Sequence, residues 1–115
     1  MITIGISPVK LGTIIFTVQF LTDAGLAATP KTLTWSLTNE AGTVINSRNR
    51  VSVTPAASNV IVCSGADLQL LTGETADYVH RRFIAEGTYD STTLGDNLPV
   101  KEVAAFVLEN NPFIT

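Results

Sequence analysis

Charged side chains are scarce in this chain. Asp, Glu, Lys and Arg make up only 15% of its 115 residues, against roughly 25% in an average soluble domain. The net charge is −3 and the sequence pI is close to 4.9. An acidic chain gains no affinity by neutralising phosphate groups, so we expect no nucleic-acid partner.

Cysteine and histidine occur once each. A single cysteine excludes an intrachain disulfide, and the apolar residues before Cys63 predict a buried small hydrophobe rather than a reactive thiol. His80 has no nucleophile near it in the predicted strand, and a catalytic triad also needs an orienting carboxylate. The glycines are scattered through turns and form no phosphate-binding loop. We therefore expect no catalytic residue, no metal ligand and no cofactor, and the sequence predicts a protein that is not an enzyme.

Long hydrophobic runs are also missing. The apolar stretch at residues 14–21 is far shorter than the roughly 20 residues that cross a bilayer. The apolar start of the chain is interrupted by Gly5, Pro8, Lys10 and Gly12, and no cleavage pattern follows it. We expect neither a signal peptide nor a membrane partner.

The most informative pattern is the alternation at residues 32–38, where Leu33, Trp35 and Leu37 are separated by Thr and Ser. Such a period of two is typical of a half-buried β-strand. The polar set should face outward and the apolar set inward. Residues 39–42 predict a turn, with a return strand at residues 43–45.

Turn signals recur at short intervals along the rest of the chain. Further strands are predicted at residues 13–21, 51–53, 59–63, 78–89 and 103–108, with a loop at residues 90–99. Ser64 and Asp67 resemble a capping box that opens about two helical turns burying Leu68 and Leu71.

About seven short strands in a chain of this length predict an all-β fold, an immunoglobulin-like antiparallel β-sandwich with one short helical turn. A small closed barrel is the structural alternative. Trp35 suits the central buried aromatic. We expect an N-terminal arm at residues 1–12, the sandwich domain at residues 13–109 and a C-terminal arm at residues 110–115.

Two weak site candidates accompany this fold. Asp90, Asp96 and Asn97 share one predicted loop and could offer oxygen ligands to calcium, but their spacing matches no dedicated calcium loop, and such residues usually start turns. Two arginine pairs form small basic spots that either pair with neighbouring carboxylates or dock on a more acidic partner: Arg48, Arg50, Arg81 and Arg82.

Apolar residues also stand where a monomer has little use for them. Both faces of the strand at residues 103–108 are apolar, so either the N-terminal arm covers its edge or one face meets another protein. Phe113 and Ile114 follow Pro112 beyond the last strand, in a tail that would ordinarily be polar. The predicted interface residues are Phe106, Leu108, Phe113, Ile114, Ile2 and Ile4.

Three segments give a family resemblance: residues 34–46 around Trp35, Glu86-Gly87-Thr88-Tyr89-Asp90, and Asn97-Leu98-Pro99-Val100. Together they resemble small immunoglobulin-like virion proteins of tailed bacteriophages, and the resemblance covers roughly residues 13–110 in pattern. It implies a structural part of the virion, without catalysis, whose partners are other virion proteins and further copies of itself.

Within a virion, a minor capsid or decoration role is preferred over a neck or tail role. The alternative is a bacterial surface Ig-like binding module that contacts carbohydrate or a receptor. Such modules are normally exported and repeated in long chains, whereas this sequence carries one predicted domain and no export signal. A small hydrolase is a weaker third possibility.

Overall fold

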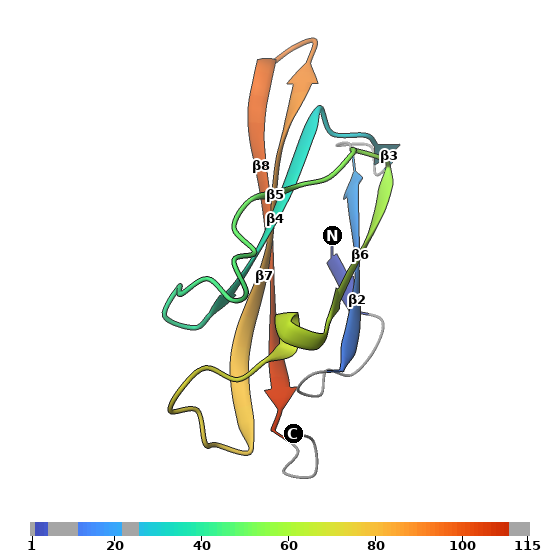
Figure 1. Cartoon of the computed structure of the whole chain (residues 1–115). Helices are drawn as coiled ribbons and strands as arrows, with labels where there is room; N and C mark the ends of the chain where they lie inside the picture. Colours follow the sequence, from blue (N-terminus) through green and yellow to red (C-terminus); the bar gives the residue numbers. More distant parts are fainter. Residues whose placement is uncertain (1, 5–11, 22–25, 111–115) are drawn as a thin grey trace.

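The computed structural model describes residues 2–4, 12–21 and 26–110. Two antiparallel four-stranded sheets face each other as the layers of a sandwich (Figure 1). The first sheet contains β1 (Ile2–Ile4), β2 (Thr13–Leu21), β3 (Ala27–Ala28) and β6 (Ser58–Ser64). The second has the order β5 (Val51–Ser52), β4 (Thr32–Asn39), β7 (Tyr78–Ser91) and β8 (Gly95–Glu109).

This arrangement confirms the predicted immunoglobulin-like sandwich. In that architecture, consecutive strands change sheets at defined points. Here the chain crosses from β2 and β3 to β4, returns to the first sheet with β6, and crosses again to β7 through the 3-10 turn η1 (Gly65–Leu68) (Figure 1). Cys63 is a free, buried thiol, so no disulfide joins the two layers.

Aromatic side chains join the layers instead. Phe16 of β2 stacks on Phe83 of β7 with ring centroids 4.1 Å apart and an 8° angle between the ring planes. Trp35 of β4 also stacks on Phe83, with ring centroids 5.7 Å apart. Phe106 of β8 contacts Phe16 in a tilted geometry, with ring centroids 5.4 Å apart. Four strands from both sheets therefore meet in one aromatic cluster, as the central position predicted for Trp35 requires.

The alternation read from the sequence places most of the core correctly. On β2, Ile14, Phe16, Val18 and Phe20 are buried. On β4, Leu33, Trp35 and Leu37 are buried as predicted, but so are Ser36 and Thr38, which we expected to face solvent. The segment after β4 folds back over this strand, and the Arg50 N–H donates to the Ser36 hydroxyl at 2.9 Å.

The predicted return strand at residues 43–45 is wrong. Only Val44 forms an isolated bridge, with Thr38, and Asn46 and Ser47 adopt left-handed backbone angles with φ of 51° and 57°. A left-handed residue cannot continue a strand. The predicted two helical turns are likewise shorter, since η1 ends at Leu68, which is fully buried, and Leu71 only packs against the margin of the core.

The predicted loop at residues 90–99 is also wrong. β7 and β8 continue through it as one long hairpin that projects beyond the first sheet (Figure 1). The turn closes at Gly95, whose φ is 119°, and Asn97, with a φ of 55°, lies where the register of the two strands shifts. Asparagine tolerates this backbone angle better than most residues, so turn-forming residues here build a β-bulge.

The hydrogen-bonding direction of β8 explains why Pro99 is tolerated within it. The Asn110 N–H donates to the Asp77 carbonyl at 2.8 Å, in continuation of the Tyr78–Glu109 register. Because successive residues of a strand point their backbone groups to opposite sides, even-numbered residues of β8 face β7. Odd-numbered residues face the free edge of the sheet, where the missing N–H of Pro99 costs no ladder bond.

The N-terminal segment contributes a strand. β1 pairs with β2, with Ile2 opposite Val18 and Ile4 opposite Phe16, and it approaches β8 without pairing with it. In the described ranges, no helix is long and apolar enough to cross a membrane.

The aromatic cluster gives a first prediction. Trp35→Ala should lower the free energy of unfolding by about 3–5 kcal/mol, because it leaves a cavity beside Phe83. Urea denaturation followed by circular dichroism measures this loss. Tyr78→Ala, at a side chain that is 62% exposed, is the control and should change stability by less than about 0.5 kcal/mol. An unchanged midpoint for Trp35→Ala would contradict its assignment to the core.

Candidate functional site

Arg81 lies inside the sandwich. Its side chain points to the core face of β7 and is 1% exposed. Its guanidinium pairs in a bidentate manner with Glu74, with an Nη1–Oε2 distance of 2.9 Å, and also donates to the carbonyls of His80 and Gln69. The predicted docking role of Arg81 is therefore wrong, because the side chain is enclosed by its own chain.

This pair has a clear electrostatic consequence. The hydrogen bonds from Arg81 hold the pKa of Glu74 below its ordinary value, against the opposing effect of partial burial. The Leu71 N–H adds a further hydrogen bond to Glu74 at 2.6 Å. The Nε of Arg81 is buried and has no hydrogen-bond partner in the described part of the chain. The ion pair between Arg81 and Glu74 therefore joins β7 to the segment that precedes this strand.

Arg48 forms the second internal pair. Its Nε donates to Asp67 of η1 at 2.7 Å, and its guanidinium lies 5.6 Å from the centre of the Trp35 ring. Burial raises the pKa of Asp67, but the hydrogen bonds from Arg48, Asn46 and the Ser64 N–H outweigh it and hold that pKa below its usual range. Arg48 therefore pairs with a neighbouring carboxylate, which was the alternative to docking on an acidic partner. Of the four predicted docking residues, Arg50 and Arg82 are exposed and take no part in the two ion pairs.

The single cysteine and the single histidine lie in different surroundings. Burial raises the pKa of Cys63 to about 12, which keeps the thiol protonated and agrees with its interpretation as a small hydrophobe. His80 is exposed on the outer face of β7, opposite Val107 of β8.

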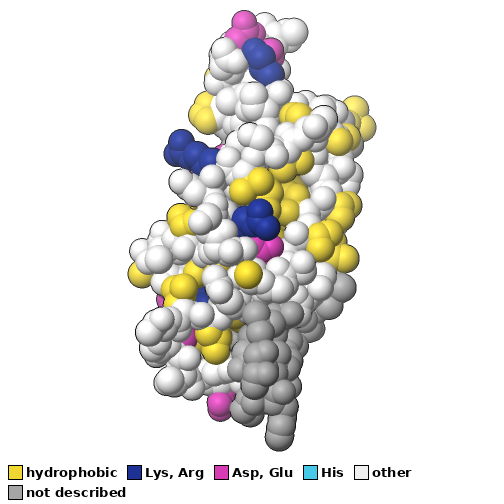
Figure 2. Space-filling view, viewed as in Figure 1, with side chains coloured by type: hydrophobic (Ala, Val, Ile, Leu, Met, Phe, Trp, Pro, Cys, Tyr) yellow, Lys and Arg dark blue, Asp and Glu magenta, His cyan; other side chains and the backbone are white. Residues whose placement is uncertain are grey.

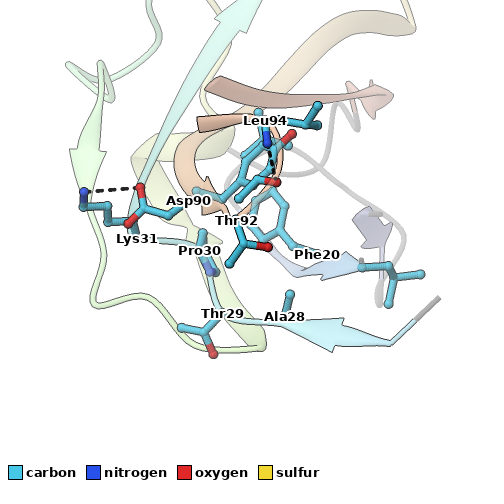
Figure 3. A pocket seen from close by; sticks show the side chains of 12 residues that line it. Phe20, Ala28, Thr29, Pro30, Lys31, Asp90, Thr92 and Leu94 are labelled. Atoms are coloured by element: carbon cyan, nitrogen blue, oxygen red, sulfur yellow. Dashed lines mark hydrogen bonds and ion pairs between the residues drawn. The ribbon is translucent and has the colours of Figure 1, made fainter. Parts of the chain in front are cut away.

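The candidate calcium ligands lie in the β-bulge of the hairpin. Asp90 accepts a hydrogen bond from the Asn97 N–H at 2.9 Å, which lowers the pKa of Asp90. The Lys31 Nζ lies 2.8 Å from the Asn97 Oδ1. It also lies 3.4 Å from an Asp90 oxygen, a contact that Figure 3 marks with a dashed line. An ammonium group thus takes the place between the two oxygens, while Asp96 is exposed. Across the ranges described, no three His, Cys, Asp or Glu residues gather in a metal-binding group.

An open groove of about 610 Å³ lies beside this bulge, where the β7–β8 hairpin projects past the end of β2 (Figure 3). Its lining includes Phe20, Pro30, Tyr89 and Leu94. Sequence reasoning missed it, because it depends on the hairpin being long. It contains aromatic and aliphatic surface with Lys31 and Asp90 at one side, the composition typical of a small-ligand site.

The outer face of β2 and β6 is an uncharged surface. Ile15 stands opposite Val62, and Thr17 opposite Val60. Val60 and Val62 are 64% and 54% exposed. The remaining outward positions of β2 and β6 are Leu21 and residues of the types Thr, Ser and Gln, so none of the outward side chains on these two strands is charged. Figure 2 shows hydrophobic side chains along the β6 side of the molecule.

The predicted interface residues of the last strand are placed differently. Phe106 and Leu108 are 6% and 0% exposed, because they complete the core under the first sheet and so cannot meet another protein. Val103 and Val107, on the opposite face of β8, are 51% and 41% exposed. Phe113 and Ile114 lie outside the described residues, and for Ile2 and Ile4 only the backbone of β1 is described.

No protein-family model, no curated protein and no solved structure matches this chain.

Acid should destabilise the fold through Glu74. Its pKa is lower in the folded state than in the unfolded state, so its stabilisation is complete above pH about 4.5 and is lost as the pH falls through the folded-state pKa. Glu74→Gln should lower the free energy of unfolding at pH 7 by up to about 3 kcal/mol, because the buried Arg81 loses its counter-charge. It should also flatten the dependence of stability on pH below that value.

Urea titrations between neutral and acid pH measure both effects. Glu40→Gln, at an exposed turn position, is the matched control and should keep the wild-type pH profile. Identical pH slopes for Glu74→Gln and the wild type would contradict the assignment.

Calcium and chelator should leave stability unchanged. The ammonium group of Lys31 already satisfies the oxygens of Asp90 and Asn97, so calcium gains no preformed site there. We expect CaCl₂ and EDTA to shift the melting temperature by less than about 1 °C in differential scanning calorimetry. A melting temperature that rises steadily with calcium concentration would instead make the bulge a metal site.

Proposed function

We propose that this chain is a non-enzymatic structural protein of a tailed-phage virion, which acts through protein–protein contacts. A minor capsid or decoration role is preferred, and a neck or tail component comes next. The proposal rests on the resemblance of residues 13–110 to small immunoglobulin-like virion proteins and on the character of the exposed sheet faces. Its location is then the virion, after synthesis in the host cytoplasm.

The observation that carries the assembly role is the uncharged outer face of β2 and β6. Two exposed valines, Val60 and Val62, lie beside Ile15 and are framed by hydroxyl and amide side chains. The centres of protein interfaces are depleted in charge, and exposed apolar patches with polar rims are typical of interaction sites. A face of this kind suits a subunit that is held in a particle by many equivalent contacts.

The polar chemistry of the chain supports the same proposal. Arg81 with Glu74, and Arg48 with Asp67, are engaged within the fold, and His80 and Cys63 lie in unrelated surroundings. Catalysis needs acid, base and nucleophile in mutual reach. The pairs seen here stabilise a rigid scaffold, which a structural subunit requires.

The alternative function is that of a bacterial surface Ig-like module which binds carbohydrate or a receptor. The groove beside the bulge favours it, because its lining combines the aromatic rings of Phe20 and Tyr89 with the polar groups of Lys31 and Asp90. Titration of the purified chain with a glycan panel distinguishes the two functions. Saturable glycan binding that Tyr89→Ala abolishes would support the surface module.

The virion role predicts that the chain occurs in purified particles. Mass spectrometry of particles from the encoding phage should detect it at a copy number that matches a particle symmetry. Val60→Lys with Val62→Lys should leave the sandwich folded, since both positions face solvent, and should reduce incorporation at least tenfold, because burying two charges is costly.

Val44→Lys is the matched control, at an exposed valine outside this face, and should enter particles normally. Absence of the wild-type chain from particles would overturn the virion role, and normal incorporation of the double variant would remove the β2–β6 face from it.

A further inference from the structure

β8 is a long strand at the edge of the second sheet. It runs over 15 residues and pairs only with β7 in the described ranges. The backbone groups of its odd-numbered residues point away from β7, as the bond from the Asn110 N–H to the Asp77 carbonyl establishes. Such an edge is a template for another strand unless a bulge, a proline or charge protects it.

Among the residues that the structure describes, a bulge and a proline protect the first part of β8. The bulge at Asn97 and the missing N–H of Pro99 spoil pairing near the hairpin turn. From residue 101 onward the strand is regular, and its register with β7 is unbroken. This half of the edge can therefore accept a partner strand.

The side chains on the outer face of this half are arranged symmetrically. They run Lys101, Val103, Ala105, Val107 and Glu109. Two such strands can pair antiparallel with Ala105 at the two-fold axis. Lys101 of each copy then lies opposite Glu109 of the other, and Val103 of each copy lies opposite Val107 of the other. Both the charges and the side-chain shapes therefore match. Opposite charges and β-branched pairs across strands stabilise a sheet.

The same geometry selects this register over its neighbours. Because the odd-numbered residues carry the free backbone groups, they must stand opposite one another. A shift by two residues places Lys101 opposite Val107 or beyond Glu109, and a shift by four in one direction places Pro99, which has no N–H, opposite Val107. The register centred on Ala105 is the one that pairs Lys101 with Glu109.

We propose that β8 pairs antiparallel with β8 of a second copy of this chain, about a two-fold axis at Ala105, to form a dimer with one continuous eight-stranded sheet. Each odd-numbered residue of β8 from 101 to 109 then donates one backbone hydrogen bond to the other copy and accepts one from it. The exposed Val103 and Val107 then form one apolar stripe with their counterparts. This contact deepens the proposed assembly role by naming one partner.

Charge reversal tests the register in solution. Sedimentation velocity over a dilution series gives the dimer dissociation constant of the wild type. Lys101→Glu places like charges opposite each other twice and should raise that constant about tenfold, as should Glu109→Lys. The double variant, Lys101→Glu with Glu109→Lys, restores both pairs and should return within about threefold of the wild type.

Glu40→Lys is the matched control, because it adds a similar charge change in an exposed turn away from β8, and it should leave the dissociation constant unchanged. A wild-type chain that is monomeric at about 1 mM, as it would be if its own N-terminal segment covered the edge, overturns the proposal. A dimer whose constant ignores both reversals overturns it as well.

Cross-linking gives a second readout that does not depend on affinity. Cα atoms of directly opposed residues lie about 5.5 Å apart, within the range of a disulfide. Ala105→Cys should therefore oxidise to a covalent dimer, whereas Val103→Cys, about 14 Å from its own copy in this register, should not. Cys63 is buried and does not compete. Equal cross-linking of both variants would contradict the register.

Failure here is distinguishable from failure of the virion role. A chain that is found in particles but is monomeric in solution would support the virion role and overturn the β8 dimer. A chain that dimerises through β8 but is absent from particles would support the β8 dimer and overturn the virion role.

Discussion

The stacking of Phe16 on Phe83 is the contact on which the rest of the structure depends. In antibody domains, a disulfide joins the second strand of one sheet to the facing strand of the other, and a tryptophan packs against it. Here β2 and β7 are joined by two parallel rings 4.1 Å apart, and Trp35 packs on one of them. The packing of aromatic rings therefore takes the place of the disulfide, and removing either ring would remove the central contact between the two sheets.

Two ion pairs close the sandwich around this cluster. Arg48 reaches from the segment after β4, covers the Trp35 ring and ends on Asp67 of η1. Arg81 extends the core face of β7 to Glu74 in the connection before it. Each pair ties the segment between β6 and β7 to the second sheet. Loss of one partner would leave the buried charge of Arg81 or Asp67 uncompensated, which is costly, so the pairs favour one arrangement of these connections.

The parts of the fold that followed from the sequence are those governed by local alternation. β2 and β4 were predicted within one residue, and the buried Trp35 followed from the same period of two. The hairpin at residues 90–99 could not be predicted, since Asp, Asn, Gly and Pro indicate turns, whereas the long β7 ladder holds them in a strand with a bulge. Tertiary pairing overrides local propensity in such a strand.

Residues of a site were harder to predict, because their role depends on which face of a strand they share. Arg81 and Arg82 are adjacent in sequence but lie on opposite faces of β7, one buried and one exposed. Phe106 and Val107 separate in the same way on β8. An alternation in which both sets are apolar does not reveal which set is inward, and only the position of Phe16 across the core decides it.

The scarcity of charge acquires a physical meaning once these places are known. Lys31, Arg48 and Arg81 pair with carboxylates of the same chain, so a large part of the small charge complement stabilises loops and connections. The outer face of β2 and β6 then carries no charge at all, and the outer face of β8 carries charge only at the two ends of an apolar stripe. A soluble monomer gains nothing from leaving these two faces so poor in charge, whereas a subunit that meets several neighbours gains interfaces with little desolvation cost. The distribution of charge, more than any single residue, is therefore the feature that supports the proposed assembly role.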